Sequence, residues 1–366
     1  MSGDINIGRT GTGTLAAQNG GKLSGLNGTV GTFTGSAGMV RVEGEGSSWT
    51  SSGDLTVGGD STAAGGSGEV NILDNGIVEV GGTLKLWDQG RVNLDGGELR
   101  LKALPSGPGV FDWNAGRLTF TADQAMDTFT IAENGTLDLE NVFLHAVNKL
   151  DFSRNSELDL NQGRLIHTSS QLQMSAGNRV TGAGDLFTGH AGLNLGQGGE
   201  LAGSGAGLDL CGDLYGSGTV GNATVYGDVY VGNSPGIMEF TGVEFRSSTL
   251  YMEIAGSGQA GVDYDQVIFN GEIDLTGVVL NILFLDDFVP EFHDSFNLFD
   301  FDNATVTGLF KEIVLPGFDE GLAWDTSNLY TLGSLDVKAA PIPGPVWLLA
   351  TGLIGLAGIR RKSMKG

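Results

Sequence analysis

The sequence predicts an all-β protein whose short strands stack into a parallel β-helix, or β-solenoid. Three observations predict it: a recurring triplet of two aliphatic residues around one polar residue, a coil spacing of about 20 residues, and abundant turn-forming glycine. Glycine supplies 63 of the 366 residues, without the three-residue period of collagen. We expect a C-terminal β cap domain after the solenoid and a short transmembrane helix at the end of the chain.

The triplets define the expected strands. Their period-two alternation points the apolar pair into the core and leaves the middle residue facing solvent. Glycine, asparagine or aspartate usually precedes a triplet and supplies a turn. A strand this short buries a core only by stacking on similar strands. The triplets are Leu55–Val57, Val70–Ile72, Leu84–Leu86, Val92–Leu94, Leu99–Leu101, Leu118–Phe120, Leu137–Leu139, Leu158–Leu160, Leu193–Leu195, Leu208–Leu210 and Val229–Val231.

The spacing of the triplets favours stacked coils. Leu118, Leu137 and Leu158 are 19 and 21 residues apart, which suits one coil of roughly 20 residues. Between Val70 and Leu101 the triplets come closer together, as if two or three strands form one coil. A β-sandwich is the alternative, but it needs longer strands and tight hairpins. Helical periodicity outside the C-terminal tail is weak, and its only candidates are residues 122–128 and 141–150.

The chain divides into three expected segments: a solenoid over residues 1–231, a β cap domain over 232–338 and a C-terminal tail over 339–366. A solenoid ends in unpaired backbone groups and an exposed apolar layer, so a cap is needed to prevent end-to-end association. Residues 278–301 are rich in aromatic and aliphatic side chains. We expect them to form hairpins that cover the last coil.

Two stretches carry a resemblance to a known class of surface protein. Residues 42–58 resemble the glycine-rich repeats of autotransporter passengers, in which Trp49 would span the coil. Residues 231–337 resemble the C-terminal cap of the same proteins. The matching stretches are 232–236, 250–254, 264–267, 271–277, 308–310 and 321–324. This resemblance implies a β-helical architecture and display at a cell surface, and it implies no reaction.

The last 26 residues are arranged like a membrane-targeting signal. Prolines precede an apolar run over residues 346–359, and a basic cluster follows it. As a helix the run is roughly 21 Å long, shorter than the hydrocarbon core of about 30 Å, which suits a temporary anchor. The basic cluster favours a cytoplasmic location for the C-terminal end of the apolar run. A buried helix is the alternative, but Gly352, Gly355 and Gly358 would weaken it.

The tail resembles the PEP-CTERM sorting signal of Gram-negative bacteria. The matching residues are Pro341, Pro343, Trp347, Arg360, Arg361 and Lys362. Ile342 stands where that family usually has glutamate. The resemblance implies processing by an exosortase-type enzyme, with transient inner-membrane anchoring before release to the surface, outer membrane or matrix. The first residues lack the basic start and apolar core of a secretory signal, so we expect an export signal upstream of Met1.

Charge and cysteine content limit the possible partners. The formal net charge is −24, so the chain repels nucleic acid and we exclude DNA and RNA as partners. The acids serve solubility or, alternatively, bind divalent cations. The single cysteine, Cys211, excludes an intramolecular disulfide. It lies in a strand-like stretch, and we expect it to be a small buried apolar residue.

The search for catalytic, cofactor-binding and metal-binding residues predicts none. His145, His167, His190 and His293 are scattered and lack zinc-site spacing. Gly216–Gly221 matches a dinucleotide fingerprint in letters only, because a strand follows instead of a helix. Gly65–Gly68 begins like a calcium-binding repeat, but Val70 replaces the aspartate ligand. Asp263 and Asp265 share one side of an expected strand and could bind calcium with Asp286 and Asp287; solvated cap residues are the alternative.

These observations favour a non-enzymatic structural or interaction protein of the cell surface or extracellular matrix, as a biofilm component or adhesin. Its repeated polar side chains would contact extracellular polysaccharide. The alternative is a polysaccharide-active enzyme. Its candidate acids are Asp138, Asp159 and Asp209, the middle residues of three triplets, which could serve as acid and base. No lysine or arginine clusters beside them in the sequence.

Overall fold

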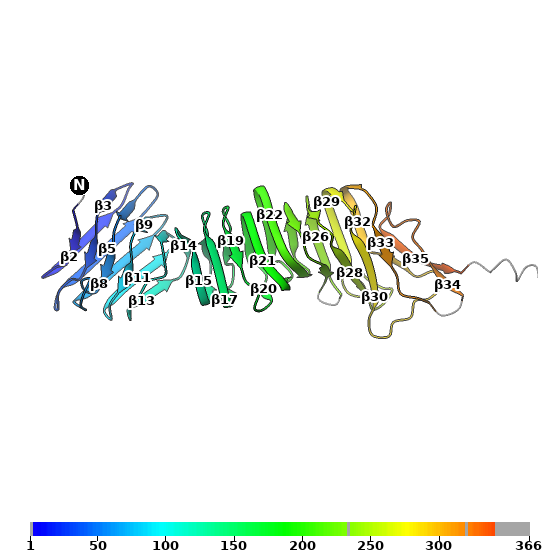
Figure 1. Ribbon diagram of the computed structural model, residues 1–366, viewed down its shortest axis with the longest axis horizontal. Helices are drawn as coiled ribbons and strands as arrows, with labels where there is room; N and C mark the ends of the chain where they lie inside the picture. The colour runs from blue at the N-terminus through cyan, green and yellow to red at the C-terminus, as the bar shows by residue number, and fades with distance from the viewer. Residues whose placement is uncertain (1–2, 233–234, 319–320, 341–366) are drawn as a thin grey trace, which may run out of the picture.

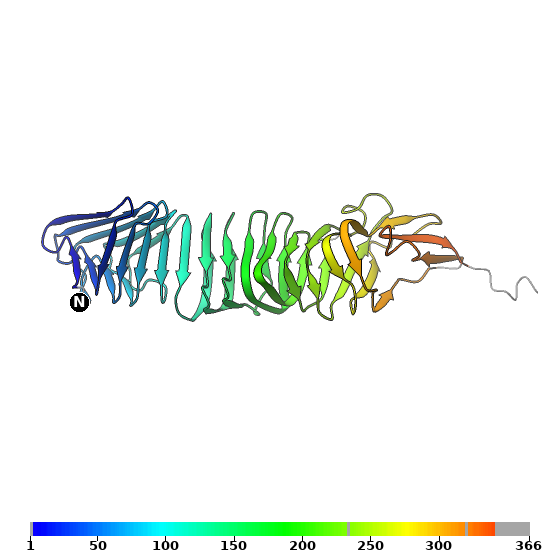
Figure 2. The ribbon, with the colours of Figure 1, turned by 90° about the horizontal axis from the view of Figure 1, so that it is seen from above.

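The computed structural model describes residues 3–232, 235–318 and 321–340, and these form strands and turns without a helix. The strands lie across the long axis of an elongated molecule, with the first coils at one end and the last strands at the other (Figures 1 and 2). The large parallel sheets are consistent with a β-solenoid, so the all-β prediction is confirmed. No membrane-crossing helix occurs in this described part. The expected tail helix lies outside it.

The N-terminal coils, residues 5–113, contribute two parallel sheets of their own. The first sheet contains β1 (Ile5–Ile7), β4 (Gly28–Val30), β7 (Leu55–Val57) and β10 (Leu84–Leu86). The second sheet contains β2 (Thr12–Ala17), β5 (Ala37–Glu43), β8 (Ser67–Leu73), β11 (Gly90–Asp95) and β13 (Val110–Trp113).

A third parallel sheet, the continuous sheet, runs through both halves of the molecule. It contains β3 (Lys22–Gly25), β6 (Ser48–Ser51), β9 (Ile77–Val80), β12 (Glu98–Leu101), β14 (Gly116–Phe120), β16 (Gly135–Asp138), β18 (Glu157–Asp159), the first parts of β21 (Arg179–Leu195) and β22 (Glu200–Gly216), β23 (Thr219–Gly221), β26 (Ile237–Thr241), β29 (Gln266–Asp274) and β32 (Phe299–Thr307).

The later coils, residues 116–314, add two further rows of parallel strands. The side sheet contains β15 (Gln124–Ile131), β17 (Phe143–Phe152), β19 (Arg164–Ile166), the middle of β21 and β22, β24 (Ala223–Val225) and β27 (Glu244–Phe245). The tyrosine sheet contains β20 (Leu172–Met174), the ends of β21 and β22, β25 (Val229–Val231), β28 (Thr249–Ile254), β30 (Val279–Phe284) and β33 (Glu312–Val314).

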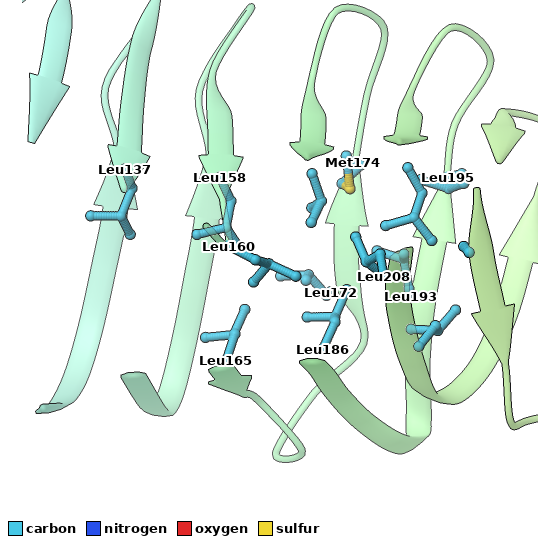
Figure 3. Packing of buried hydrophobic residues seen from close by; sticks show 14 of the residues in the cluster. Leu137, Leu158, Leu160, Leu165, Leu172, Met174, Leu186, Leu193, Leu195 and Leu208 are labelled. Carbon is cyan, nitrogen blue, oxygen red and sulfur yellow. The ribbon is translucent and has the colours of Figure 1, made fainter. Parts of the chain in front are cut away.

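The predicted coil spacing is confirmed by the strand register of the later coils, whereas the N-terminal coils are longer: Leu23 pairs with Trp49, and Trp49 pairs with Val78. Leu118 pairs with Leu137, and Leu137 pairs with Leu158, each on the next coil of the continuous sheet. All three side chains are buried, and Figure 3 shows Leu137 and Leu158 pointing into the stack. Because every coil repeats the inward positions, one hydrophobic cluster fills the whole stack.

Trp49 occupies the coil-spanning position that the sequence predicts. It lies on the continuous sheet, is 1% exposed, and a Cβ placed on Gly28 of the first sheet would lie 2.6 Å from its Cζ2 atom. The indole therefore reaches across the coil. Gly28 is needed because a side chain there would overlap the ring.

The two weak helical candidates are wrong. Residues 122–128 and 141–150 lie mainly in β15 and β17, which pair in parallel with each other from Gln124 and Leu144 onward. Met126, Phe129 and Ile131 of β15 are buried among exposed neighbours, which suits a strand with one face in the core and a register shift between Met126 and Thr128. Tertiary stacking therefore overrides the weak local preference.

The expected hairpins over residues 278–301 are also wrong. β30 pairs in parallel with β28 and β33, so coil stacking continues well past the expected boundary at residue 232. The antiparallel part is a small sheet of β31 (Ser295–Asn297), β35 (Ser334–Ala339) and β34 (Leu322–Asp325). It contacts the last coils, since the Phe299 N–H donates to the Gly333 carbonyl and the ring centroids of Phe284 and Trp324 lie 5.9 Å apart. It lies at the C-terminal end in Figure 1.

Candidate functional site

A stack of three turns joins the continuous sheet to the side sheet in successive later coils. The turn residues Asn141, Gln162 and Gly184 have φ values of 63°, 67° and 145°, in the region that non-glycine residues seldom adopt. The Asn141 N–H donates to the Asn161 carbonyl at 3.0 Å, and the Gln162 N–H donates to the Ala183 carbonyl at 2.6 Å. The turns therefore stack in register, and the side chains of Asn141 and Gln162 lie at the same corner of successive coils.

A groove of about 380 Å³ lies along this corner. Its lining residues are Asp123, Asn141, Val142, Phe143, Gln162, Gly163, Arg164, Gly184 and Asp185. Phe143, Arg164 and Asp185 are register partners on β17, β19 and β21, and Asp123 belongs to the coil before them. The groove thus runs across successive coils along the stack.

The charged groups of the groove are already partnered within the protein. Arg164 Nη2 lies 2.6 Å from Asp185 Oδ2, and its guanidinium lies 5.2 Å from the Phe187 ring centroid. Asp123 Oδ1 accepts a hydrogen bond from the Phe143 N–H at 2.9 Å. These contacts hold the floor of the groove in place.

The two carboxamides on the rim have no such partners. Asn141 and Gln162 are exposed, and among the described residues neither side chain makes a hydrogen bond. Each carboxamide offers two donors and one accepting oxygen. The groove therefore presents unused hydrogen-bonding groups beside the half-buried Phe143 ring.

Two of the three candidate catalytic acids lie close to this corner. Asp138 and Asp159 are register partners on β16 and β18, and Arg117 Nη1 lies 2.6 Å and 3.0 Å from their respective Oδ2 atoms. Asp138 lies between the buried Leu137 and Leu139 and so faces outward as expected, but it is only 5% exposed because Arg117 and Asn161 cover its carboxylate. Asp209 is apart from them, because it lies on the side sheet as the register partner of Asp185.

Sequence reasoning missed Arg117. Arg117 is distant from both acids along the chain, but it lies on β14, which pairs with β16 and so precedes Asp138 by one coil. The coil spacing alone could have revealed this neighbour, because Arg117 and Thr136 occupy equivalent positions. The Asn161 side chain completes the cluster by donating to Asp138 Oδ1 at 3.1 Å.

The expected calcium ligands have separate structural roles. Asp265 is buried and accepts hydrogen bonds from the N–H groups of Gly236 and Glu253, both at 2.7 Å. Burial raises the pKa of Asp265 to about 7, against the opposing effect of these two donors. Asp263 instead accepts from the Gln259 N–H. Asp286 and Asp287 have φ values of 51° and 56° in a turn.

Metal-binding geometry does not occur among the described residues: no three histidine, cysteine, aspartate or glutamate side chains are grouped to hold an ion there. The ring nitrogens of buried His167 lie 3.0 Å from the Ala146 carbonyl and 3.0 Å from Ser170 Oγ. His190 lies 3.3 Å from Asp213. His145 contacts the Phe143 ring, and His293 contacts Phe292.

Cys211 and the two glycine motifs also have structural positions. Cys211 is half-buried on β22, less than the full burial that we expected, and this burial raises the pKa of its thiol. Gly216 ends β22 and β23 follows, so the dinucleotide pattern leads into a strand as expected. Gly65 and Gly66 precede β8, in which Val70 is a core residue.

A ladder of three tyrosines marks the outer face of the tyrosine sheet. Adjacent rings of Tyr215, Tyr230 and Tyr251 have centroids 4.6 Å apart and planes within 5° of each other. Burial between neighbouring rings raises the pKa of Tyr230 to about 12. Since the rings cover one another's faces, they expose edges and hydroxyls instead of a stacking platform for sugars.

The residues of the expected sorting signal, Pro341, Pro343, Trp347, Arg360, Arg361 and Lys362, lie outside the described part of the chain. No protein-family model matches the chain, and no curated protein matches it.

Proposed function

We propose that this chain is an exported structural or interaction protein of the cell surface or extracellular matrix. The observation that carries this proposal is a long stack of parallel coils whose outer side chains form polar ladders. One such ladder on the continuous sheet contains Glu98, Arg117, Thr136, Glu157, Arg179 and Glu200. A repeated polar face of this kind suits contact with an extended, repetitive partner.

In this proposal, the C-terminal tail directs the export and sorting of the protein. Its resemblance to a PEP-CTERM signal supports transient insertion of residues 346–359 in the inner membrane and processing by an exosortase-type enzyme. The resemblance of residues 42–58 and 231–337 to autotransporter passengers supports display outside the cell. The small antiparallel sheet at the end of the stack serves as the cap.

The natural termini test the proposal. Mass spectrometry would be applied to the protein from the inner membrane, the outer membrane and the culture medium. We expect the external form to end near Pro341 and to lack residues 346–366. A protein that stays in the cytoplasm with Gly366 intact contradicts the proposal.

The second candidate is a polysaccharide-active enzyme, which the pairing of Asp138 and Asp159 beside the groove favours. Arg117 bridges both carboxylates, and Asp138 is almost completely covered, so the pair offers a substrate little direct access. Purified protein and the variant D159N would be assayed on a panel of polysaccharides. Turnover that D159N abolishes supports the enzyme; absence of turnover on every polymer opposes it.

A further inference from the structure

We propose that the groove between the continuous sheet and the side sheet binds a neutral, hydroxyl-rich polysaccharide. This inference rests on the proposed surface function and assigns it a specific site, around Asn141, Phe143 and Gln162. It follows from the direction of the groove, its free hydrogen-bonding groups, its charge and the pairing of its strands.

The direction of the groove suits a linear ligand. Phe143, Arg164 and Asp185 succeed one another on adjacent coils, and the stacked turns of Asn141 and Gln162 follow the same direction. Neighbouring strands lie about 4.8 Å apart, so equivalent side chains recur at that interval. The volume of about 380 Å³ is within the usual range for a ligand site. A chain lying along the stack would meet the same chemical groups repeatedly.

The available groups suit hydroxyls. The carboxamides of Asn141 and Gln162 can each donate to one hydroxyl and accept from another, and no protein group of the described residues competes for them. The Phe143 ring offers an apolar surface for the C–H groups of a sugar. A mostly apolar ligand would form no hydrogen bonds with the carboxamides on the rim, so these groups would contribute nothing to its binding.

The charge of the groove opposes an anionic polymer. Arg164 is the only cation among the lining residues, and its guanidinium is paired with Asp185. Asp123 contributes a further carboxylate, and the whole chain has a formal charge of −24. A uronate or sulfated polymer would meet net repulsion, whereas a neutral polymer would not.

The strand pairing opposes an extended peptide. β19 pairs with β17 on one side and with β21 on the other, so the groove contains no free strand edge there. A peptide therefore cannot bind by adding a strand to the sheet, which is the usual way in which backbone groups provide affinity at a β surface. Side-chain contacts to hydroxyls remain as the source of binding.

Affinity electrophoresis of the full-length protein in detergent tests the site directly. The gels would contain a neutral β-glucan, a neutral galactomannan or alginate, which is a uronate polymer. We expect at least one neutral polymer to retard the protein and alginate to have no effect. Retardation by alginate alone, or by no polymer, would overturn the proposal.

The key variant is N141G/Q162G, because glycine accepts the positive φ of both turns and removes both carboxamide side chains. We expect at least tenfold weaker binding, with an unchanged circular dichroism spectrum and thermal unfolding. A second variant, F143L, keeps an apolar side chain and should weaken binding several-fold. The control Q173A removes an exposed amide from the tyrosine sheet, whose one side-chain hydrogen bond among the described residues is to Gln171, and it should bind normally. Normal binding by N141G/Q162G would refute the assigned site.

Different results would refute the groove proposal and the proposed surface function. A protein found outside the cell that binds no neutral polymer refutes the groove proposal and leaves the surface function standing. A protein retained in the cytoplasm with its tail intact refutes the surface function, whatever the purified protein binds.

Discussion

The N-terminal coils and the later coils share one sheet and differ in the other two. The continuous sheet passes from β12 to β14 and β16 without interruption. In the described chain, however, β13 pairs only with β11, and β10 is extended only by a single bridge between Lys85 and Ser106. The side sheet begins anew at β15. Among the described residues, strand pairing therefore joins the two sets of coils through the continuous sheet alone.

The sequence at the junction explains the loss of pairing. Pro105 and Pro108 flank Ser106, and proline has no N–H to donate to a neighbouring strand. Trp113 fills the junction instead, with its ring centroid 6.2 Å from that of Phe129 and its indole N–H donating to the Gly116 carbonyl. Side-chain packing thus couples the two sets of coils where the backbone ladder is interrupted.

The largest expected effect concerns the core of the N-terminal coils. W49A should lower the free energy of unfolding of these coils by about 3 to 5 kcal/mol, because it empties a fully buried, coil-spanning site. Denaturant titration with regional hydrogen exchange would locate the loss. W49F is the matched control: it keeps an aromatic ring and removes an indole N–H that has no partner among the described residues, so its cost should be much smaller. Equal costs would contradict the coil-spanning role.

The next effect belongs to the later coils and depends on pH. Asp265 has a pKa of about 7 against an ordinary 3.8, so its contribution to stability is complete below pH 3.8 and is lost as the pH rises through 7. At about 1.4 kcal/mol per pKa unit, the unfolding free energy should fall by roughly 4 kcal/mol across this window. Regional hydrogen exchange at several pH values would place the loss in the later coils.

Two variants check the assignment to Asp265. D265N should be less stable overall, because one of the two backbone donors then faces an amide NH₂, but its pH dependence should be flatter. D263N is the control, since Asp263 is a partly exposed turn residue, and it should keep the wild-type slope. An unchanged slope in D265N would show that another group titrates.

The junction itself should give a smaller loss. W113A should cost about 2 kcal/mol, below the full value for a buried tryptophan because this indole is only half-buried. It should also separate the unfolding of the two sets of coils into two transitions, since their packing contact is weakened. V110A, on the same strand but exposed, is the control. A single transition at unchanged midpoint in W113A would mean that the continuous sheet alone couples the halves.

The smallest effect tests the fit of the indole. A Cβ on Gly135 would lie 2.8 Å from the Trp113 Cε2 atom, so G135A should cost about 1 kcal/mol through overpacking. The same change in the W113A background should cost almost nothing. A double-mutant cycle measures this coupling, and additive costs would show that Gly135 and Trp113 do not interact.

Local sequence was sufficient for the strands and the coil length. Alternation at Leu118–Phe120 and Leu137–Leu139 specifies an inward and an outward face, and the interval between these triplets equals one coil because stacked strands must keep their register. The candidate site was harder to predict from the sequence. Neither Asn141 nor Gln162 stands out in the sequence, since the groove exists only when turns of successive coils lie side by side.

By itself, then, the sequence determined an all-β chain with short strands, a repeating core and, in the later coils, a length of about 20 residues per coil. Tertiary structure alone decided that β30 pairs in parallel, that β31 joins β35 in an antiparallel sheet, and that Arg117 forms ion pairs with both Asp138 and Asp159. The physical reason is that alternation fixes which face of a strand is buried, but not the direction or identity of its neighbour. Pairing partners and the environment of each charge depend on residues one or more coils away.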